Sequence, residues 1–347
     1  MELVSICGFP ERSEAGWRWI LFENPEQGDE PAGYVFEKNG RIDSIICSYR
    51  RMYRNRQAER SQVMAHTFVS GLESPGSGFR LVKHFLAKHG ADVANTLNNN
   101  ALSAPIYPRV GAIAWRGDDG RNFIERPLKW SSLVRSRVYN GLSGGPLRAL
   151  VTGWEHLERG VRGLPTDGQF AAFTVLDPNA PSCAAQLDAF NDAMRSGDQF
   201  QADRSAKIWS YRLRDPDYKN GMCVLGALDG DRLIALLSVS LAKDDEFSAS
   251  ALEIEDMVSL DHGMVSQKDM LAAACAIGSK SGAARVRHRM PSAELLSELP
   301  EGWMLRSRSY DNAHIKSRVE DVPELWQAGP FDSDFFFALR RPEKLRG

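Results

Sequence analysis

The feature that most constrains the fold of this chain is an internal repeat, in which the pattern at 17–42 recurs at 209–234. In the first half, the aromatic segment 17–19 is followed by Asn24-Pro25; in the second half, the aromatic segment 209–211 is followed by Asp215-Pro216. Proline pushes the residue before it out of the helical region, so both Asn/Asp-Pro pairs end a helix. The two patterns are separated by about 190 residues, which is the length of a domain and much longer than a solenoid unit. The repeat therefore predicts a duplicated domain.

Each aromatic segment is followed by a predicted β-hairpin. Asn39-Gly40 and Asp229-Gly230 supply the positive φ angles that a two-residue hairpin turn needs. In the first half, the pattern predicts strands at 2–7, 32–37, 41–50, 61–69, 91–97 and 111–116, with a helix opened by Gly76 and Gly78. In the second half, it predicts a hairpin at 222–241, strands at 169–176, 251–260 and 283–289, helices at 181–195 and 266–279, and closing segments at 303–317 and 333–340.

The length of 347 residues suits two domains. We expect an α+β protein with a first domain at 1–125, a linker at 126–165 that holds a helix near 129–139, and a second domain at 166–347. Each domain is expected to contain a mixed, mostly antiparallel sheet flanked by helices.

Composition excludes several classes of function. The net charge is −2, with 43 basic and 45 acidic residues, so we expect no nucleic-acid partner. Five scattered cysteines without a CxxC pair indicate buried or free thiols in a reducing compartment, and no apolar run approaches the roughly 20 residues of a membrane span. Metal-ligand spacing is also missing. We expect a cytoplasmic protein, monomeric or homodimeric, that acts on a small molecule and does not bind a membrane.

One segment has the pattern of a phosphate-binding loop. A strand at 61–69 runs into a turn with Gly76 and Gly78, which opens a helix. Backbone N–H groups at a helix start bind phosphate, and glycine allows a diphosphate to approach closely. The Lys-Ser/Thr of a P-loop is missing, and Leu81 occupies the third glycine position of the dinucleotide fingerprint. A tight strand-to-helix connection without a ligand is the alternative.

A second segment follows the strand predicted at 91–97, with Asn100, Ser103, Tyr107 and Gly111 in the pattern Asn-x-x-Ser-x-x-x-Tyr-x-x-x-Gly. Together, the two segments resemble the GCN5-related N-acetyltransferase superfamily, over residues 1–116 and more faintly over 168–340. The resemblance implies two tandem copies of that fold and an acyl-coenzyme A co-substrate, either acetyl-coenzyme A or another acyl form. It also implies donor-site residues at Phe68, Val69, Ser74, Gly76, Ser77, Gly78, Phe79, Arg80, Asn100 and Ser103.

Two departures from the superfamily pattern concern the diphosphate. Glu73 stands where the superfamily has Gln or Arg, and a carboxylate repels a diphosphate at short range. Either Glu73 turns away and Arg80 compensates, or the loop no longer binds coenzyme A. In the second half, the matching stretch 260–268 lacks Gly-x-Gly, so we expect that copy to have lost its donor site.

The resemblance implies direct transfer of the acyl group to an amine or hydroxyl, with no covalent enzyme intermediate. Tyr107 matches the superfamily's usual acid, which protonates the departing thiolate, and a backbone N–H near Phe68 or Val69 would stabilise the oxyanion. His66 on the same strand is a candidate base. Glu255, Asp256 and Asp334 are candidate acceptor-binding residues. A purely structural role is the alternative for all of these residues. Tyr107 would then only pack in the core, His66 would be an ordinary strand residue, and the three carboxylates would be surface or turn residues.

Three functions follow from this pattern. The first is an acyl-coenzyme A-dependent N-acyltransferase, in its narrower form an acetyltransferase, acting on a small amine, amino sugar or precursor. The second is an aminoacyl transferase of the peptidoglycan-bridge type, which would need a charged transfer RNA and a more basic groove. The third is a degenerate, non-catalytic pair that senses coenzyme A or binds a partner, and Glu73 is its best support.

Overall fold

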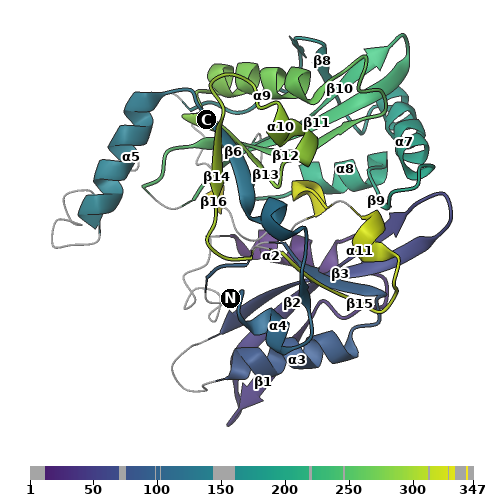
Figure 1. Ribbon diagram of the computed structural model, residues 1–347, viewed down its shortest axis with the longest axis vertical. Coiled ribbons are helices and arrows are strands. Elements are labelled where there is room, and N and C mark those ends of the chain that lie inside the picture. Colours follow the sequence, from purple (N-terminus) through teal and green to yellow (C-terminus); the bar gives the residue numbers. More distant parts are fainter. Residues whose placement is uncertain are drawn as a thin grey trace. The chain divides into compact units, whose positions relative to one another are not determined.

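The structure is a computed structural model that divides into two compact units, each with its own sheet (Figure 1). Unit 1 comprises residues 1–121, 191–216 and 307–339, and unit 2 comprises 122–190, 217–306 and 340–347. Within these units, the structure describes residues 12–69, 76–97, 99–101, 103–143, 161–218, 221–244, 247–311, 313–326, 328–332 and 341–342.

The sheet of unit 1 has the order β1-β2-β3-β4-β15-β5, and β9 adds to β2. Its strands are β1 (Gly33–Lys38), β2 (Arg41–Arg54), β3 (Glu59–Val69), β4 (Val93–Thr96), β5 (Ile113–Ala114), β9 (Gln201–Ala202) and β15 (His314–Ser317). The pairing is antiparallel except between β3 and β4, which run parallel.

The helices of unit 1 are α2 (Glu14–Phe22), α3 (Ser77–Lys88), α4 (Ile106–Arg109), α8 (Ala206–Leu213) and α11 (Val322–Leu325), with 3-10 turns η1 (Gly117–Arg121) and η3 (Pro330–Asp332). Helix α3 packs on β1, β2 and β3 through a buried face of Leu81, Val82, Phe85 and Leu86. Burying each such side chain stabilises the fold by about 1.5–3 kcal/mol. The rings of Trp19 and Tyr211, which are equivalent in the repeat, stack with their centroids 4.3 Å apart.

The sheet of unit 2 has the order β14-β6-β13-β12-β11-β10-β8-β7, and β16 adds to β11. Its strands are β6 (Asn122–Pro127), β7 (Gln169–Phe170), β8 (Phe173–Val175), β10 (Met222–Asp229), β11 (Arg232–Lys243), β12 (Ala251–Ser259), β13 (Arg285–Arg289), β14 (Met304–Ser307) and β16 (Arg341–Pro342). The remaining helices are α5 (Trp130–Ser143), α7 (Pro181–Arg195), α9 (Gln267–Ser281) and α10 (Ala293–Ser297). Leu271, Ala274 and Ile277 of α9 pack into the core of this sheet.

The two sheets confirm the predicted duplication. The hairpin β1-β2 has a register shift between Phe36 and Glu37, and the hairpin β10-β11 has one between Ala227 and Leu228. Both irregularities lie just before the hairpin turn. The second turn is Gly230-Asp231, one residue later than the predicted Asp229-Gly230, because Asp229 pairs with Arg232. The fold class is therefore the predicted one, α+β with two mixed and mostly antiparallel sheets.

The units differ from the continuous segments 1–125 and 166–347 that the repeat suggested, because one strand from each half of the chain belongs to the sheet of the other half. The β15 strand from the second half lies between β4 and β5, and the β6 strand from the first half lies between β13 and β14. The prediction that all of 303–317 closes the second sheet is therefore wrong for β15. The expected helix of the linker exists as α5, within unit 2.

Four cysteines lie in the part of the chain that the structure describes, and all are free thiols. Burial raises the pKa of Cys47 and of Cys223 to about 12, so neither forms a thiolate near neutral pH. No helix among the described residues combines the length and the apolar character that crossing a membrane requires.

The exchange of strands predicts that a fragment of residues 1–165 does not fold alone. It lacks β15, so the facing edges of β4 and β5 lose their ladder partner. We expect aggregation, or a broad thermal transition in circular dichroism, where the full-length chain melts cooperatively. A fragment that melts as sharply as the full-length chain would contradict this.

A second prediction concerns acid stability and His89, the C-cap residue of α3, which is buried beside Phe85. Burial and the positive charge of Arg318 lower the pKa of His89 from 6.5 to about 4. Below pH 6.5 the unfolded chain therefore binds a proton that the folded chain does not bind until about pH 4. This contribution lowers the free energy of unfolding as the pH falls through that window, by at most about 1.4 kcal/mol per pH unit.

We expect His89→Phe to reduce the difference between urea midpoints measured at pH 7.5 and pH 5. His84→Phe, at an exposed position of the same helix, controls for the loss of a histidine from α3. An unchanged midpoint difference in His89→Phe would show that another group carries the acid dependence.

Candidate active site

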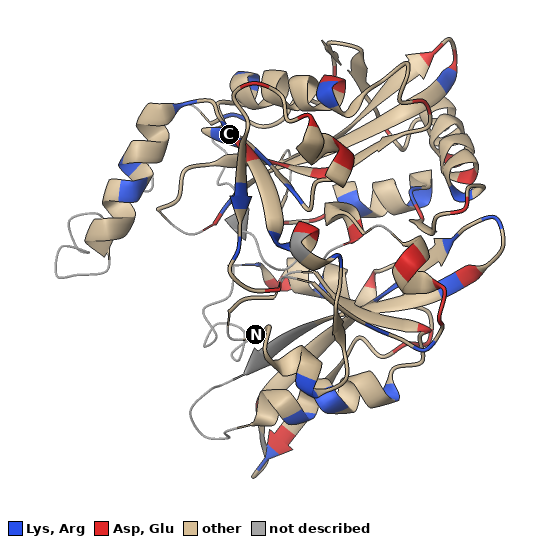
Figure 2. Ribbon diagram, in the orientation of Figure 1, with Lys and Arg blue, Asp and Glu red and all other residues tan. Residues whose placement is uncertain are grey.

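The first element of the candidate site is the N-terminus of α3. Gly76 is the N-cap residue with φ of 86°, and no side chain caps the helix among the described residues. The first turn has no acidic residue, and the helix carries Arg80, Lys83 and Lys88 without a carboxylate (Figure 2). Its first backbone N–H groups are therefore not occupied by the helix's own side chains, and the dipole favours an anion there.

Ser77 adds a polar group at this point. Its side chain is 1% exposed, and its hydroxyl makes no hydrogen bond to any described residue. A buried hydroxyl without a partner costs free energy unless a ligand or water satisfies it. Gly78 and Phe79 are half-buried, and Arg80 is exposed, with its guanidinium 6.0 Å from the ring of Phe36. Ser74 and Glu73 lie outside the described residues.

The second element is the divergence of β3 from β4. Their parallel ladder joins only Gln62–Met64 to Val93–Asn95, although β3 continues to Val69. Beyond Met64, β3 pairs with β2 but with no described residue of β4, so one edge of its backbone is left for another partner. The backbones of His66, Phe68 and Val69 lie in this stretch, and their side chains lie outside the described residues.

The third element is the segment that begins α4. The amide N–H of Asn100 donates to the Ser103 hydroxyl at 3.0 Å, and the Ser103 N–H donates to the Asn100 side-chain oxygen at 2.9 Å. These two predicted donor-site residues therefore brace each other in a turn. The turn places Tyr107 on α4, where its side chain is 8% exposed and belongs to the core cluster under α3.

Tyr107 stacks on His314, a residue that the sequence pattern did not single out. The ring centroids lie 5.3 Å apart at an interplanar angle of 20°. His314 is 1% exposed, and its Nδ1 lies 2.7 Å from Asn99 Nδ2, so the amide donates to a neutral ring. Burial lowers the pKa of His314, which favours that neutral form. His314 lies on β15, and no local sequence pattern indicates that this strand belongs to the first sheet.

A second residue of β15, Lys316, contacts the end of the α4 segment. Lys316 Nζ donates to the Val110 carbonyl at 3.0 Å, next to Gly111, which has φ of 81°. The pattern Asn100, Ser103, Tyr107 and Gly111 is thus folded against β15, and unit 1 brings together α3, the open edge of β3 and Tyr107.

The second copy lacks these features at its matching helix. Ser266 caps α9 by accepting from the Asp269 N–H at 3.2 Å, and the Asp269 carboxylate accepts from the Ser266 N–H at 2.9 Å. This capping box occupies the N–H groups of Ser266 and Asp269 and places a negative charge in the first turn, which repels a phosphate. The pattern Ser-x-x-Asp at 266–269 is a sequence signal for this cap that the repeat comparison overlooked.

The predicted acceptor-binding residues lie in the second unit or outside the described residues. Glu255 and Asp256 are buried on β12, so the alternative of surface or turn residues is wrong for both. The Ser240 hydroxyl donates to Glu255 Oε1 at 2.6 Å, and the Met257 N–H donates to Asp256 Oδ1 at 3.1 Å. Asp334 lies outside the described residues.

Solved structures share this fold at low sequence identity. A GCN5-related N-acetyltransferase from Anabaena variabilis aligns with a TM-score of 0.50 and 12% identity, over 88% of this chain and 65% of that chain. The N-myristoyltransferase of Saccharomyces cerevisiae, solved with bound myristoyl-CoA, aligns with a TM-score of 0.52 and 10% identity, over 94% of this chain and 76% of that chain. This chain therefore spans just under two thirds of the length of the Anabaena protein.

No protein-family profile and no curated protein sequence matches the chain. The likeness is therefore one of fold. In this chain the fold occurs twice, and each sheet has a parallel strand pair followed along the sheet by a strand from the other half. The chain has the tandem fold of the GCN5-related N-acetyltransferases.

Proposed function

We propose that the protein is an acyl-coenzyme A-dependent N-acyltransferase with a single donor site, in unit 1. The observation that carries this proposal is the contrast between the two matching helix starts. At α3, a left-handed glycine, a buried serine hydroxyl and uncapped N–H groups suit a diphosphate. At α9, a capping box with Asp269 does not. Acyl-coenzyme A supplies both a diphosphate and a thioester, and the yeast N-myristoyltransferase of similar fold was solved with bound myristoyl-CoA.

The open edge of β3 gives the thioester a place in this proposal. Backbone N–H groups near Phe68 and Val69 have no ladder partner in β4 among the described residues. One of them would donate to the carbonyl oxygen of the thioester and stabilise the negative charge that develops when an amine attacks. His66, two residues before Phe68, is the proposed base that takes the proton of the amine.

Tyr107 is the proposed acid. When the C–N bond forms and the C–S bond breaks, the departing thiolate takes a proton, and the phenol hydroxyl of Tyr107 would supply it. The stack on neutral His314 and the packing under α3 hold the phenol ring in place. His314 acts through Tyr107 in this scheme, so we treat it as a positioning residue.

We further propose that the acyl group is acetyl and that the acceptor is a small amine, an amino sugar or a related precursor. The buried carboxylates Glu255 and Asp256 are the described candidates for a cationic acceptor. Asp334 is a further candidate from the sequence. The protein would then work on a small acceptor as a monomer or homodimer in the cytoplasm.

The donor site is tested by thermal shift with acetyl-coenzyme A. At 100 times the dissociation constant, binding should stabilise the folded chain by about 2.7 kcal/mol. Gly78→Trp fills the start of α3 and should abolish the shift. Lys268→Trp, at the matching exposed position of α9, is the control, and its thermal shift with acetyl-coenzyme A should equal that of the wild type. If acetyl-coenzyme A stabilises Gly78→Trp as much as the wild type, the donor site is not at α3.

The acid is tested with Tyr107→Phe, which keeps the packed ring and removes the hydroxyl. General acid catalysis contributes typically 10²–10⁴-fold, so we expect kcat to fall by about 100-fold or more while the affinity for acetyl-coenzyme A stays within about twofold. The assay is steady-state release of free coenzyme A with a panel of small amines. A phenylalanine variant with unchanged kcat would assign Tyr107 to packing alone, and binding without turnover in the wild type would favour a coenzyme A sensor.

A further inference from the structure

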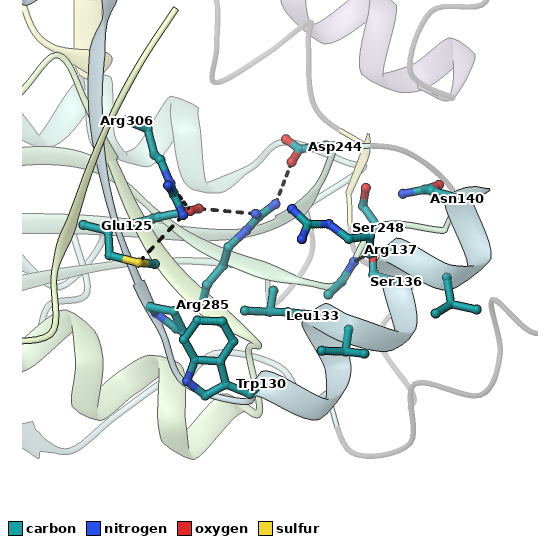
Figure 3. A pocket seen from close by; sticks show the side chains of 15 residues that line it. Glu125, Trp130, Leu133, Ser136, Arg137, Asn140, Asp244, Ser248, Arg285 and Arg306 are labelled. Atoms are coloured by element: carbon teal, nitrogen blue, oxygen red, sulfur yellow. Dashed lines mark hydrogen bonds and ion pairs between the residues drawn. The ribbon is translucent and has the colours of Figure 1, made fainter.

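Unit 2 contains a pocket of about 620 Å³ that the proposed transferase does not use (Figure 3). One side of α5 forms a wall, and residues of β6, β14 and the segment before β12 complete it. Ala249 lies just before β12 and Arg285 begins β13, so the pocket is at the start of this parallel strand pair. The donor site of unit 1 lies at the opposite end of its strand pair, so this pocket is not the second copy of that site.

The helical wall is apolar and uncovered. Trp130, Val134 and Val138 follow one another at intervals of four residues, and their exposed fractions are 64%, 59% and 53%. Side chains four residues apart lie on one face of a helix. None of the residues of α5 described in the structure is buried, and a helix of 14 residues is marginal without packing. An apolar ligand that covers this face would therefore stabilise α5.

Hydrogen bonds nevertheless fix α5 to its unit. The N–H groups of Leu128 and Lys129, just before the helix, donate to the Ala284 carbonyl at 2.8 and 3.0 Å. In the middle of the helix, the Ser136 hydroxyl accepts from the Ala249 N–H at 3.0 Å. The wall is thus anchored at two places, which makes the pocket a built feature of unit 2.

The floor of the pocket is polar, and its carboxylates are already paired. Glu125 accepts from Arg306 at 3.1 Å and lies 3.4 Å from Arg285, and Asp244 accepts from Arg285 at 2.7 Å. The third lining arginine, Arg137, makes no hydrogen bond or ion pair with any described residue, and Figure 3 shows its side chain pointing from α5 into the pocket. Three arginines against two carboxylates leave the lining with an excess positive charge.

The geometry points to an amphiphilic anion as the ligand: a carboxylate on a medium-length hydrocarbon chain. The carboxylate would pair with Arg137 in a charge-assisted, bidentate contact, and the chain would lie along Leu133, Val134 and Met304. The pocket volume is of the size that is usual for small-molecule sites. Helix α5 carries Arg135 and Arg137 and no carboxylate, so pairing with α5 of a second copy would bring like charges together (Figure 2).

The test is calorimetric titration of the full-length protein with decanoate, decyltrimethylammonium and decanol. We expect decanoate to bind saturably with one site, decanol more weakly, and the cation not at all. Arg137→Leu should weaken decanoate binding by about tenfold or more, because it removes both hydrogen bonds of the bidentate, charge-assisted contact. Arg135→Leu, on the same helix but outside the pocket lining, should bind decanoate like the wild type. Circular dichroism confirms that both variants are folded.

Four results would overturn the proposal. They are equal binding of the cationic and anionic probes, an equal loss in Arg137→Leu and Arg135→Leu, wild-type affinity in Arg137→Leu, or no decanoate binding at all. Sedimentation of the wild type and of Val134→Asp provides a further check. A dimer that Val134→Asp dissociates would show that a second copy covers α5, and this would also overturn the assignment of a small anion.

Discussion

The ladder that β15 forms with β4 on one side and β5 on the other is the interaction on which the candidate active site depends. It closes the first sheet with a strand that arrives from the far end of the chain. The same strand places His314 against Tyr107 and Lys316 against the carbonyl at the end of α4. Without it, the α4 segment would keep its local turns and its packing under α3, but the tyrosine would lose the ring of His314 on which it stacks.

The two copies share one backbone arrangement but differ in the side chains at the start of the matching helix. Both have a helix that follows a strand of a parallel pair, and the helix dipole is present in both. What differs is the first turn. At α3, which starts with Gly76 and Ser77, no side chain accepts from the first N–H groups. At α9, the side chains of Ser266 and Asp269 each accept a hydrogen bond from the other's N–H group. A capping box stabilises its helix, so the second copy has local stability at a position where no side chain caps the first copy's helix.

Local patterns in the sequence predict most of the fold, because hairpin turns, Asn/Asp-Pro stops and apolar periodicity act over short stretches. Helix α7 matches its predicted bounds of 181–195, and β10, β12 and α9 lie close to theirs. The sheet that β15 joins could not be predicted this way, since His314-Ile315-Lys316-Ser317 has the same alternation whichever sheet it pairs with. For the same reason the sequence indicated Tyr107, which lies in a motif, but not His314, which lies in none. The buried state of Glu255 was also missed, because acidic residues on a strand are normally exposed.

The exchange of β6 and β15 has an evolutionary consequence. In a simple tandem duplication, a redundant copy can decay or be deleted without harm to its neighbour. Here each half supplies an inner strand to the other's sheet, so a deletion that removes one half also removes a structural part of the other. Selection would therefore preserve the framework of the second copy while its helix start drifts freely, and new chemistry can arise there without risk to the original reaction.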